Sequence, residues 1–336
     1  MGEGMILTQK ESQVLKGIAI LLMLFHHLFA FKERIPNDMV FSDLTVIIAK
    51  FGNLCVPIFL FISGYGLAKI NKRTHADFGN RIKKFFLHYW LVFLVFVPLC
   101  LLAGNIEITP LNFIFNLFAL KTTYNGEWWF ATLYTLLLLV VPYFYRLSSK
   151  SILILTLSIT VAHFILYRVL PAEILYFIPN FTPTIAFGLG FITVRIEPII
   201  SKNLENYLKK FDNPLGIMLL CTIFLLLVII GARVPSFMNI ACPVYILYLK
   251  HIYIYIYKII NVNWLEGLLV KLGNRSLFMW LTHSFYCYKL IPHIIYFTEN
   301  AIIIFLLLVF ISYMTAVVLE WLYRLLFKFF NWRWVS

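Results

Sequence analysis

The segment KGIAILLMLFHHLFAF, residues 16–31, decides the class of this protein. It belongs to an apolar run over 14–31, and about 17–25 such residues cross a hydrocarbon core of about 30 Å as a helix. The run also carries two adjacent histidines, His26 and His27. Ionisable side chains are costly inside a bilayer and are functional candidates there by default. The segment therefore predicts a membrane-spanning helix that contributes to a site.

Similar apolar runs recur along the whole chain of 336 residues. The chain is 62% hydrophobic and 13% charged, with a mean hydropathy of +0.87, whereas soluble domains contain about 45–50% apolar and about 25% charged residues. We expect an all-α polytopic membrane protein with about ten transmembrane helices, forming a single domain over 1–336 without an appended soluble domain. The predicted spans are 14–31, 45–68, 85–103, 128–145, 151–168, 181–195, 214–231, 237–257, 276–295 and 301–322. Residues 108–120 are too short to cross and are expected to be re-entrant or interfacial.

The net charge of +13 comes mainly from lysines and arginines in short loops between the apolar runs. This distribution follows the positive-inside rule and favours a multi-pass protein of the cytoplasmic membrane with both termini cytoplasmic. It argues against a nucleic-acid partner. Five cysteines lie singly in apolar segments without a C-x-x-C pair, so neither a disulfide framework nor a metal site is indicated.

Lys16 and His27 are eleven residues apart on the predicted first helix. That spacing is three turns plus roughly 20°, with a rise of about 16 Å, so the two side chains share a face. A cation at the membrane edge can hold an anionic group, while an imidazole three turns deeper can move a proton. A pantetheine arm has about this length, so the spacing suits acyl transfer from coenzyme A. The alternative for His27 is a hydrogen bond to a neighbouring helix, and for His26 this packing role is favoured.

Several further segments occur in the order typical of one known family. LKGIAILLMLFHHL resembles the opening helix of the acyltransferase family 3 membrane proteins, in which an arginine or lysine precedes a histidine by the same spacing. Further segments that resemble the family are PIFLFISGYGLAKI, RIKKFFLHYW, NGEWWFATLYTLLLLVVPYF, FGLGFITVR and LGNRSLFMWLTHSF. Two departures stand out: Lys16 replaces the more common arginine, and Leu87 and His88 replace the usual prolines.

The resemblance implies transfer of an acyl group, with acetyl expected, from acyl-CoA to a hydroxyl of a carbohydrate or lipid-linked sugar. The implied donor-binding residues are Lys16, Arg81, Ser63 and Tyr65, the catalytic residues are His27 as general base and Glu127, and the substrate-binding residues are Trp128, Trp129 and His283. No metal is implied. Histidine suits the role of base because its pKa lies near working pH.

Each of these residues also has a structural alternative. Arg81 fits ordinary positive-inside charge, and Ser63 with Tyr65 fits a close helix contact. Trp128 and Trp129 fit an interfacial aromatic belt, while His283, like His88, fits polar packing.

Two other function classes compete with acyl transfer. Buried histidines also serve as proton relays in transporters or flippases of lipid-linked saccharides, although we find no inverted repeat, which many transporters show. A haem-binding electron carrier would need histidine pairs at facing heights. The sequence leaves open whether the chain forms a homo-oligomer.

Overall fold

All regular secondary structure in the described part of the chain is helical. The computed structural model describes residues 6–36, 39–70, 75–175, 178–260 and 263–329. The longer helices are α1 (Gln9–Phe29), α2 (Asp43–Phe51), α3 (Cys55–Ala68), α4 (His75–Leu102), α6 (Trp129–Phe144), α7 (Ser149–Val169), α9 (Thr184–Lys209), α10 (Pro214–Arg233), α12 (Cys242–Ile260), α13 (Asn263–Phe285) and α15 (Ala301–Phe329). The short ones are η1 (Lys32–Arg34), η2 (Gly52–Leu54), α5 (Pro110–Leu117), η3 (Gly126–Trp128), α8 (Ala172–Leu175), α11 (Pro235–Ile240), η4 (Tyr286–Leu290, a π-helix) and α14 (Pro292–Ile295).

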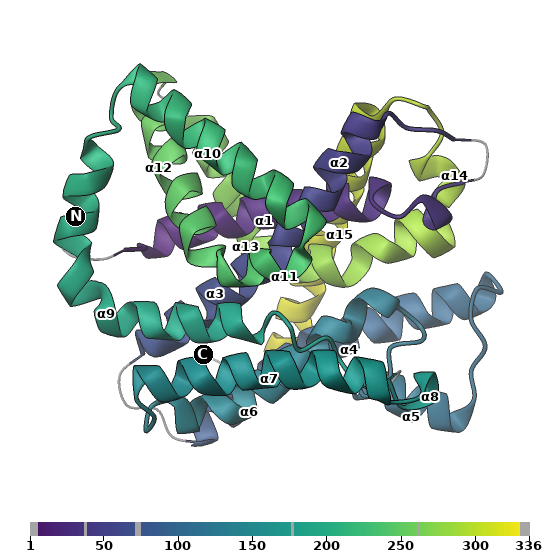
Figure 1. Cartoon of the computed structure of the whole chain (residues 1–336). Coiled ribbons are helices and arrows are strands. Elements are labelled where there is room, and N and C mark those ends of the chain that lie inside the picture. Colours follow the sequence, from purple (N-terminus) through teal and green to yellow (C-terminus); the bar gives the residue numbers. More distant parts are fainter. Residues whose placement is uncertain (1–5, 37–38, 71–74, 176–177, 261–262, 330–336) are drawn as a thin grey trace.

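The histidine-bearing helix α1 runs through the middle of the molecule (Figure 1). It packs most extensively against α13, and also against α2, α3, α12 and α15. Its polar first turn is fixed by a capping box, in which the Thr8 hydroxyl accepts from the Glu11 amide at 3.2 Å and the Glu11 carboxylate accepts from the Thr8 amide at 2.7 Å. The helix therefore begins at Gln9, five residues before the predicted apolar span.

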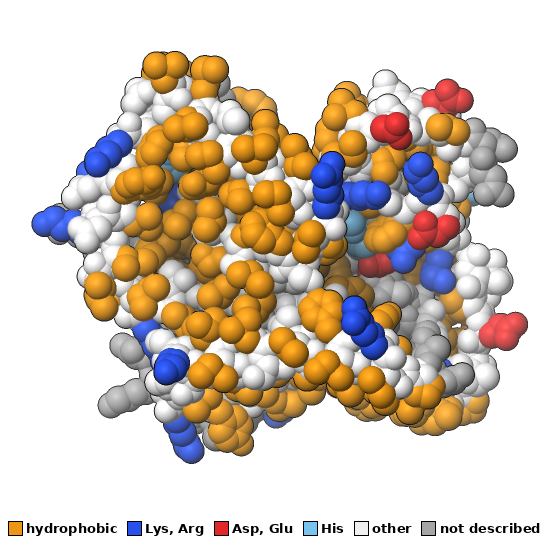
Figure 2. Space-filling model, in the orientation of Figure 1, with side chains coloured by type: hydrophobic (Ala, Val, Ile, Leu, Met, Phe, Trp, Pro, Cys, Tyr) orange, Lys and Arg blue, Asp and Glu red, His pale blue; other side chains and the backbone are white. Residues whose placement is uncertain are grey.

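Eight helices of the described chain are long and apolar enough to cross a membrane. They are Gln9–Phe29, Asp43–Ala68, Asp77–Leu102, Gly126–Phe144, Ser149–Val169, Thr184–Lys209, Pro214–Arg233 and Ala301–Leu326. Each overlaps one predicted span, and hydrophobic side chains cover much of the surface in Figure 2. These findings confirm an all-helical, multi-pass membrane protein. The cytoplasmic orientation of both ends remains a prediction, and residues 1–5 and 330–336 lie outside the described part.

The two remaining predicted spans, 237–257 and 276–295, do not appear among these eight. The first falls on α11 and α12, and the second falls on the end of α13, η4 and α14. α13 is helical and central, but its first two-thirds carry Glu266, Lys271 and Arg275. Because its second half is buried between other helices, this helix needs no continuous apolar surface facing lipid. The segment 108–120 contains α5, whose eight residues span about 12 Å, so it is too short to cross a membrane, as predicted.

Two helix crossings are close because glycines stand at them. A Cβ atom at Gly17 of α1 would overlap the carbonyl oxygen of Leu269, and one at Gly273 of α13 would overlap that of Gln13. The crossing of α3 and α9 is built in the same way, with Gly64 against the backbone of Phe187. Small residues allow membrane helices to approach at backbone distance. The crossing of α1 and α13 fixes the position of His27 relative to His283.

Candidate active site

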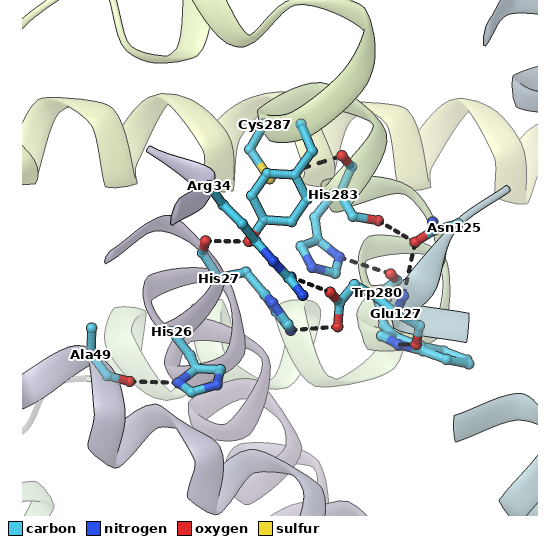
Figure 3. A network of polar contacts seen from close by, with 11 residues as sticks. His26, His27, Arg34, Ala49, Asn125, Glu127, Trp280, His283 and Cys287 are labelled. Atoms are coloured by element: carbon cyan, nitrogen blue, oxygen red, sulfur yellow. Dashed lines mark hydrogen bonds and ion pairs between the residues drawn. The ribbon is translucent and has the colours of Figure 1, made fainter. Parts of the chain in front are cut away.

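The centre of the candidate site is the carboxylate of Glu127, which two basic side chains contact from different elements (Figure 3). His27, near the end of α1, places its Nε2 3.3 Å from Oε2 of Glu127. Arg34, in η1, donates from Nη1 to Oε1 at 2.6 Å. The His27 and Glu127 side chains are each about one-tenth exposed. Residues from both sides of the loop after α1 thus meet a residue nearly a hundred positions away in sequence.

The backbone around Glu127 is held by its neighbour Asn125 and by side chains of α13. Asn125, which caps η3, accepts from the Glu127 amide at 3.1 Å through its side-chain oxygen. The same oxygen accepts from the hydroxyl of Ser284 at 2.9 Å. Trp280 donates from Nε1 to the Glu127 carbonyl oxygen at 3.2 Å. These bonds fix the backbone from which the Glu127 side chain projects.

Two histidines lie side by side at this point, His27 and His283, with ring centres 4.9 Å apart. His283 Nδ1 lies 2.8 Å from the carbonyl oxygen of Trp280. Since a carbonyl only accepts, this nitrogen donates, and Nε2 of His283 carries the lone pair. By the same reasoning, a His27 that donates from Nε2 to the Glu127 carboxylate keeps its lone pair on Nδ1. Both of these lone-pair nitrogens are buried without a hydrogen-bond partner among the described residues.

Arg34 supplies a permanent positive charge beside the carboxylate. Partial burial disfavours its charged form, but the Glu127 carboxylate and Tyr288 outweigh this effect and raise the pKa of Arg34 above its ordinary value. The guanidinium also lies over the ring of Phe31, at 4.3 Å from its centre, and over that of Tyr288, at 5.2 Å. Arg34 is therefore held from three sides.

An inner cavity of about 480 Å³ connects the cations of the predicted donor site with His27 and Glu127. Ligand-binding pockets commonly have volumes of about 300–1,000 Å³. Six residues with a predicted role in the site line this cavity: Lys16, His27, Ser63, Arg81, Glu127 and Trp129. Other polar residues in its lining are His26, Lys84, His88 and Ser276. The structure thus brings together most of the residues that the sequence picked out.

An outer cavity of about 520 Å³ lies on the other side of the Glu127 carboxylate. Its lining combines apolar surface with the polar side chains of Glu33, Arg34, Asn125, Ser284 and Lys289. Glu127 lines both cavities. The His27–Glu127 pair is therefore at the junction of two spaces, each large enough for part of a substrate.

Trp128 has a different position from the one expected of a sugar-facing platform. It is fully buried, its Nε1 donates to the carbonyl oxygen of Leu281 at 3.0 Å, and its ring packs edge-on against Tyr89 and Phe285. The side chain faces the core because η3 turns it away from the cavity that Trp129 lines. Trp128 is a packing residue, contrary to the sequence-based expectation.

Tyr65 also lies away from the residues that line the inner cavity. Its hydroxyl donates to the buried carboxylate of Glu197 in α9 and accepts from the amide of Leu7 at 3.1 Å. Lys69 pairs with the same carboxylate. Tyr65 thus fastens the segment before α1 to α3 and α9, which is a structural role and not the donor contact expected from the sequence. His283 likewise lines neither cavity, but its ring contacts that of His27.

Sequence reasoning missed Arg34. One signal was present, since Arg34 follows the first span on the side where the positive-inside rule leaves few cations. An arginine that departs from this bias is a candidate for a specific anionic partner, which the structure identifies as Glu127. His26, expected to serve in packing, donates from Nδ1 to the carbonyl oxygen of Ala49 at 2.7 Å.

Comparison with protein families identifies the family of this chain. The family model Acyl_transf_3, described as "Acyltransferase domain", matches residues 10–322, essentially the whole chain. This match confirms the resemblance noted in the sequence. No curated protein and no solved structure matches the chain.

Proposed function

The chain belongs to this acyltransferase family, and on that premise we propose that it moves an acyl group, with acetyl expected, from acyl-CoA to a hydroxyl of an envelope carbohydrate or lipid-linked sugar. The observation that carries the proposal is the pairing of His27 with Glu127 at the junction of two cavities. We place the reaction in the cytoplasmic membrane, with the donor taken from the cytoplasm.

The donor fits the inner cavity by charge and by length. Lys16, Arg81 and Lys84 line it and provide cations for the phosphates of coenzyme A. Lys16 and His27 are separated by about 16 Å along one face of α1, which suits an extended pantetheine arm. A lysine contacts phosphate as a point charge, without the bidentate geometry of arginine, and Arg81 supplies that geometry in the same cavity. The thioester then lies near His27.

The acceptor hydroxyl is activated at the His27–Glu127 pair. His27 takes the hydroxyl proton through the nitrogen that does not face Glu127, while the acceptor oxygen attacks the thioester carbonyl carbon. The new C–O bond forms as the C–S bond breaks, and the proton passes from the imidazolium to the departing thiolate to give free coenzyme A. Glu127 orients the imidazole and stabilises its charged form. The outer cavity is suited to the acceptor, because hydroxyl-rich ligands need hydrogen-bonding side chains and Asn125 and Ser284 line it.

The first test compares envelope glycans by mass spectrometry in cells with and without the protein. A gain of one acetyl group that depends on the protein supports the proposal. Purified protein with acetyl-CoA and the glycan should then release free coenzyme A as the glycan gains mass. Movement of the glycan across vesicles without covalent change would instead favour transport.

His27→Ala tests the general base. Proton transfer by a positioned side chain is typically worth about 10²–10⁴ in rate, so the acetyl transfer rate should fall by that factor. The matched control is His163→Ala, which removes a buried histidine of α7 outside the inner and outer cavities and should leave the rate unchanged. A folded His27→Ala protein that transfers acetyl at the full rate would exclude His27 as the base.

A further inference from the structure

Phe31 stands beside His27 in the wall of the inner cavity, at the end where the acyl group would lie. Phe31 lines this cavity directly after α1. Its ring is stacked on that of His27, with centres 5.9 Å apart and planes inclined by 22°, and it meets His26 edge-on at 5.0 Å. A thioester held near His27 for attack must therefore direct its acyl chain into a space bounded by this ring.

The ring of Phe31 is supported from behind. The Arg34 guanidinium lies 4.3 Å from the ring centre on the side of the outer cavity. Arg34 is itself held by Glu127 at 2.6 Å. A longer acyl chain that displaced the ring would have to disturb this ion pair, which positions the reacting groups. Phe31 is thus held in place in the wall of the inner cavity.

The side wall at this end is equally tight. His26 is fixed by its hydrogen bond to the carbonyl oxygen of Ala49. Gly52 packs so closely on α1 that a Cβ at its position would lie 2.7 Å from that of His26 and overlap the Leu22 carbonyl oxygen. Cys55, also lining the cavity, is buried. The wall therefore has little freedom to move outward.

From this geometry we propose that Phe31 determines the acyl-group size, admitting acetyl and excluding butyryl and longer chains. This inference rests on the proposed acyl transfer and goes beyond it by naming the residue that limits the length of the acyl chain. Removing the Phe31 ring should enlarge the inner cavity toward the outer cavity, because Arg34, which lies behind the ring, lines the outer cavity.

The test measures kcat/KM of wild type and Phe31→Ala with acetyl-CoA and butyryl-CoA, on the same hydroxyl acceptor. A hydrophobic pocket discriminates by about 10–200-fold per methylene, so the ratio of butyryl to acetyl transfer should rise at least about tenfold in Phe31→Ala. The matched control is Phe59→Ala, which removes a ring one turn along α3 from Cys55 in the same cavity. It should change both rates by the same factor and leave their ratio unchanged.

The possible outcomes separate this inference from the proposed function. An unchanged ratio in an active Phe31→Ala protein would overturn the inference and leave acyl transfer intact, whereas a wild type that uses no acyl-CoA would overturn acyl transfer itself. If Phe31→Ala does not fold, Phe31→Leu should show a smaller rise in the ratio. Butyryl-CoA should also inhibit acetyl transfer more strongly in Phe31→Leu than in wild type. Equal inhibition would contradict the role of Phe31 in limiting acyl-group size.

Discussion

At the level of single residues, the sequence identifies the groups that carry chemistry better than it identifies their partners. Lys16, His27 and Glu127 stand out because ionisable side chains are expensive near apolar runs. Arg34 and Glu127 are far apart in sequence, and only the fold places them 2.6 Å from each other. A single sequence does not contain that long-range pairing in any local pattern.

The same limit explains why the buried position of Trp128 was not predicted from the sequence. Trp128 and Trp129 are adjacent and chemically identical, and both start the fourth predicted span. The 3₁₀ turn η3 directs Trp128 into the core and Trp129 to the inner cavity. Local geometry of this kind depends on the capping by Asn125 and on packing against α13, neither of which the dipeptide reveals.

Arg34 should act on catalysis through Glu127. In Arg34→Ala the carboxylate loses its stronger partner and is free to turn away from His27. Small misplacements of reacting groups cost on the order of 10²-fold, so we expect acetyl transfer to lose about that factor in kcat/KM with the protein still folded. Steady-state kinetics with acetyl-CoA measures this.

The control for Arg34→Ala is Lys32→Gln, which removes one positive charge from the same short helix at an exposed position. Lys32 lines neither the inner nor the outer cavity, so this variant should keep the wild-type rate. Full activity in a folded Arg34→Ala protein would show that Glu127 is oriented by other contacts.

At the level of elements, hydropathy predicts helices that face lipid and is less informative about helices that face protein. Eight predicted spans coincide with helices of suitable length and composition. α13 does not meet that description because it carries charges in its first half and packs along α1. Its path through the centre follows from close packing, and the glycines at the crossing are the only trace of it in the sequence.

The glycine crossing of α1 and α13 should be sensitive to a single methyl group. Gly273→Ala would press a Cβ into the backbone of α1 at Gln13. Overpacking of this kind costs typically about 1–3 kcal/mol, so the midpoint of thermal unfolding in detergent should fall.

Gly267→Ala is the matched control, because it lies on the same helix with open space around its Cβ position. At this position the higher helix propensity of alanine is worth up to about 1 kcal/mol, so the midpoint of thermal unfolding should remain unchanged or rise. Equal midpoints for the two variants would mean that the crossing is looser than the backbone contact indicates.

At the level of the whole molecule, two cavities meet at one carboxylate within a bundle of membrane helices. The inner cavity carries the cations of Lys16, Arg81 and Lys84, and the outer one has a mixed polar lining. The sequence predicted the alignment of Lys16 with His27, since helix geometry alone determines it. The outer cavity was not predictable, because its walls come from η1, η3 and η4, which are brief elements in loops or at a helix end.

The most direct test of this account is a structure of the protein bound to a non-cleavable thioether analogue of acetyl-CoA, determined by electron microscopy in a lipid environment. We expect the phosphates of the analogue beside Lys16, Arg81 and Lys84, and its acetyl group beside the His27 ring, with the methyl group against Phe31. An analogue bound with its acetyl end outside the inner cavity, or with no density between Lys16 and His27, would contradict the account.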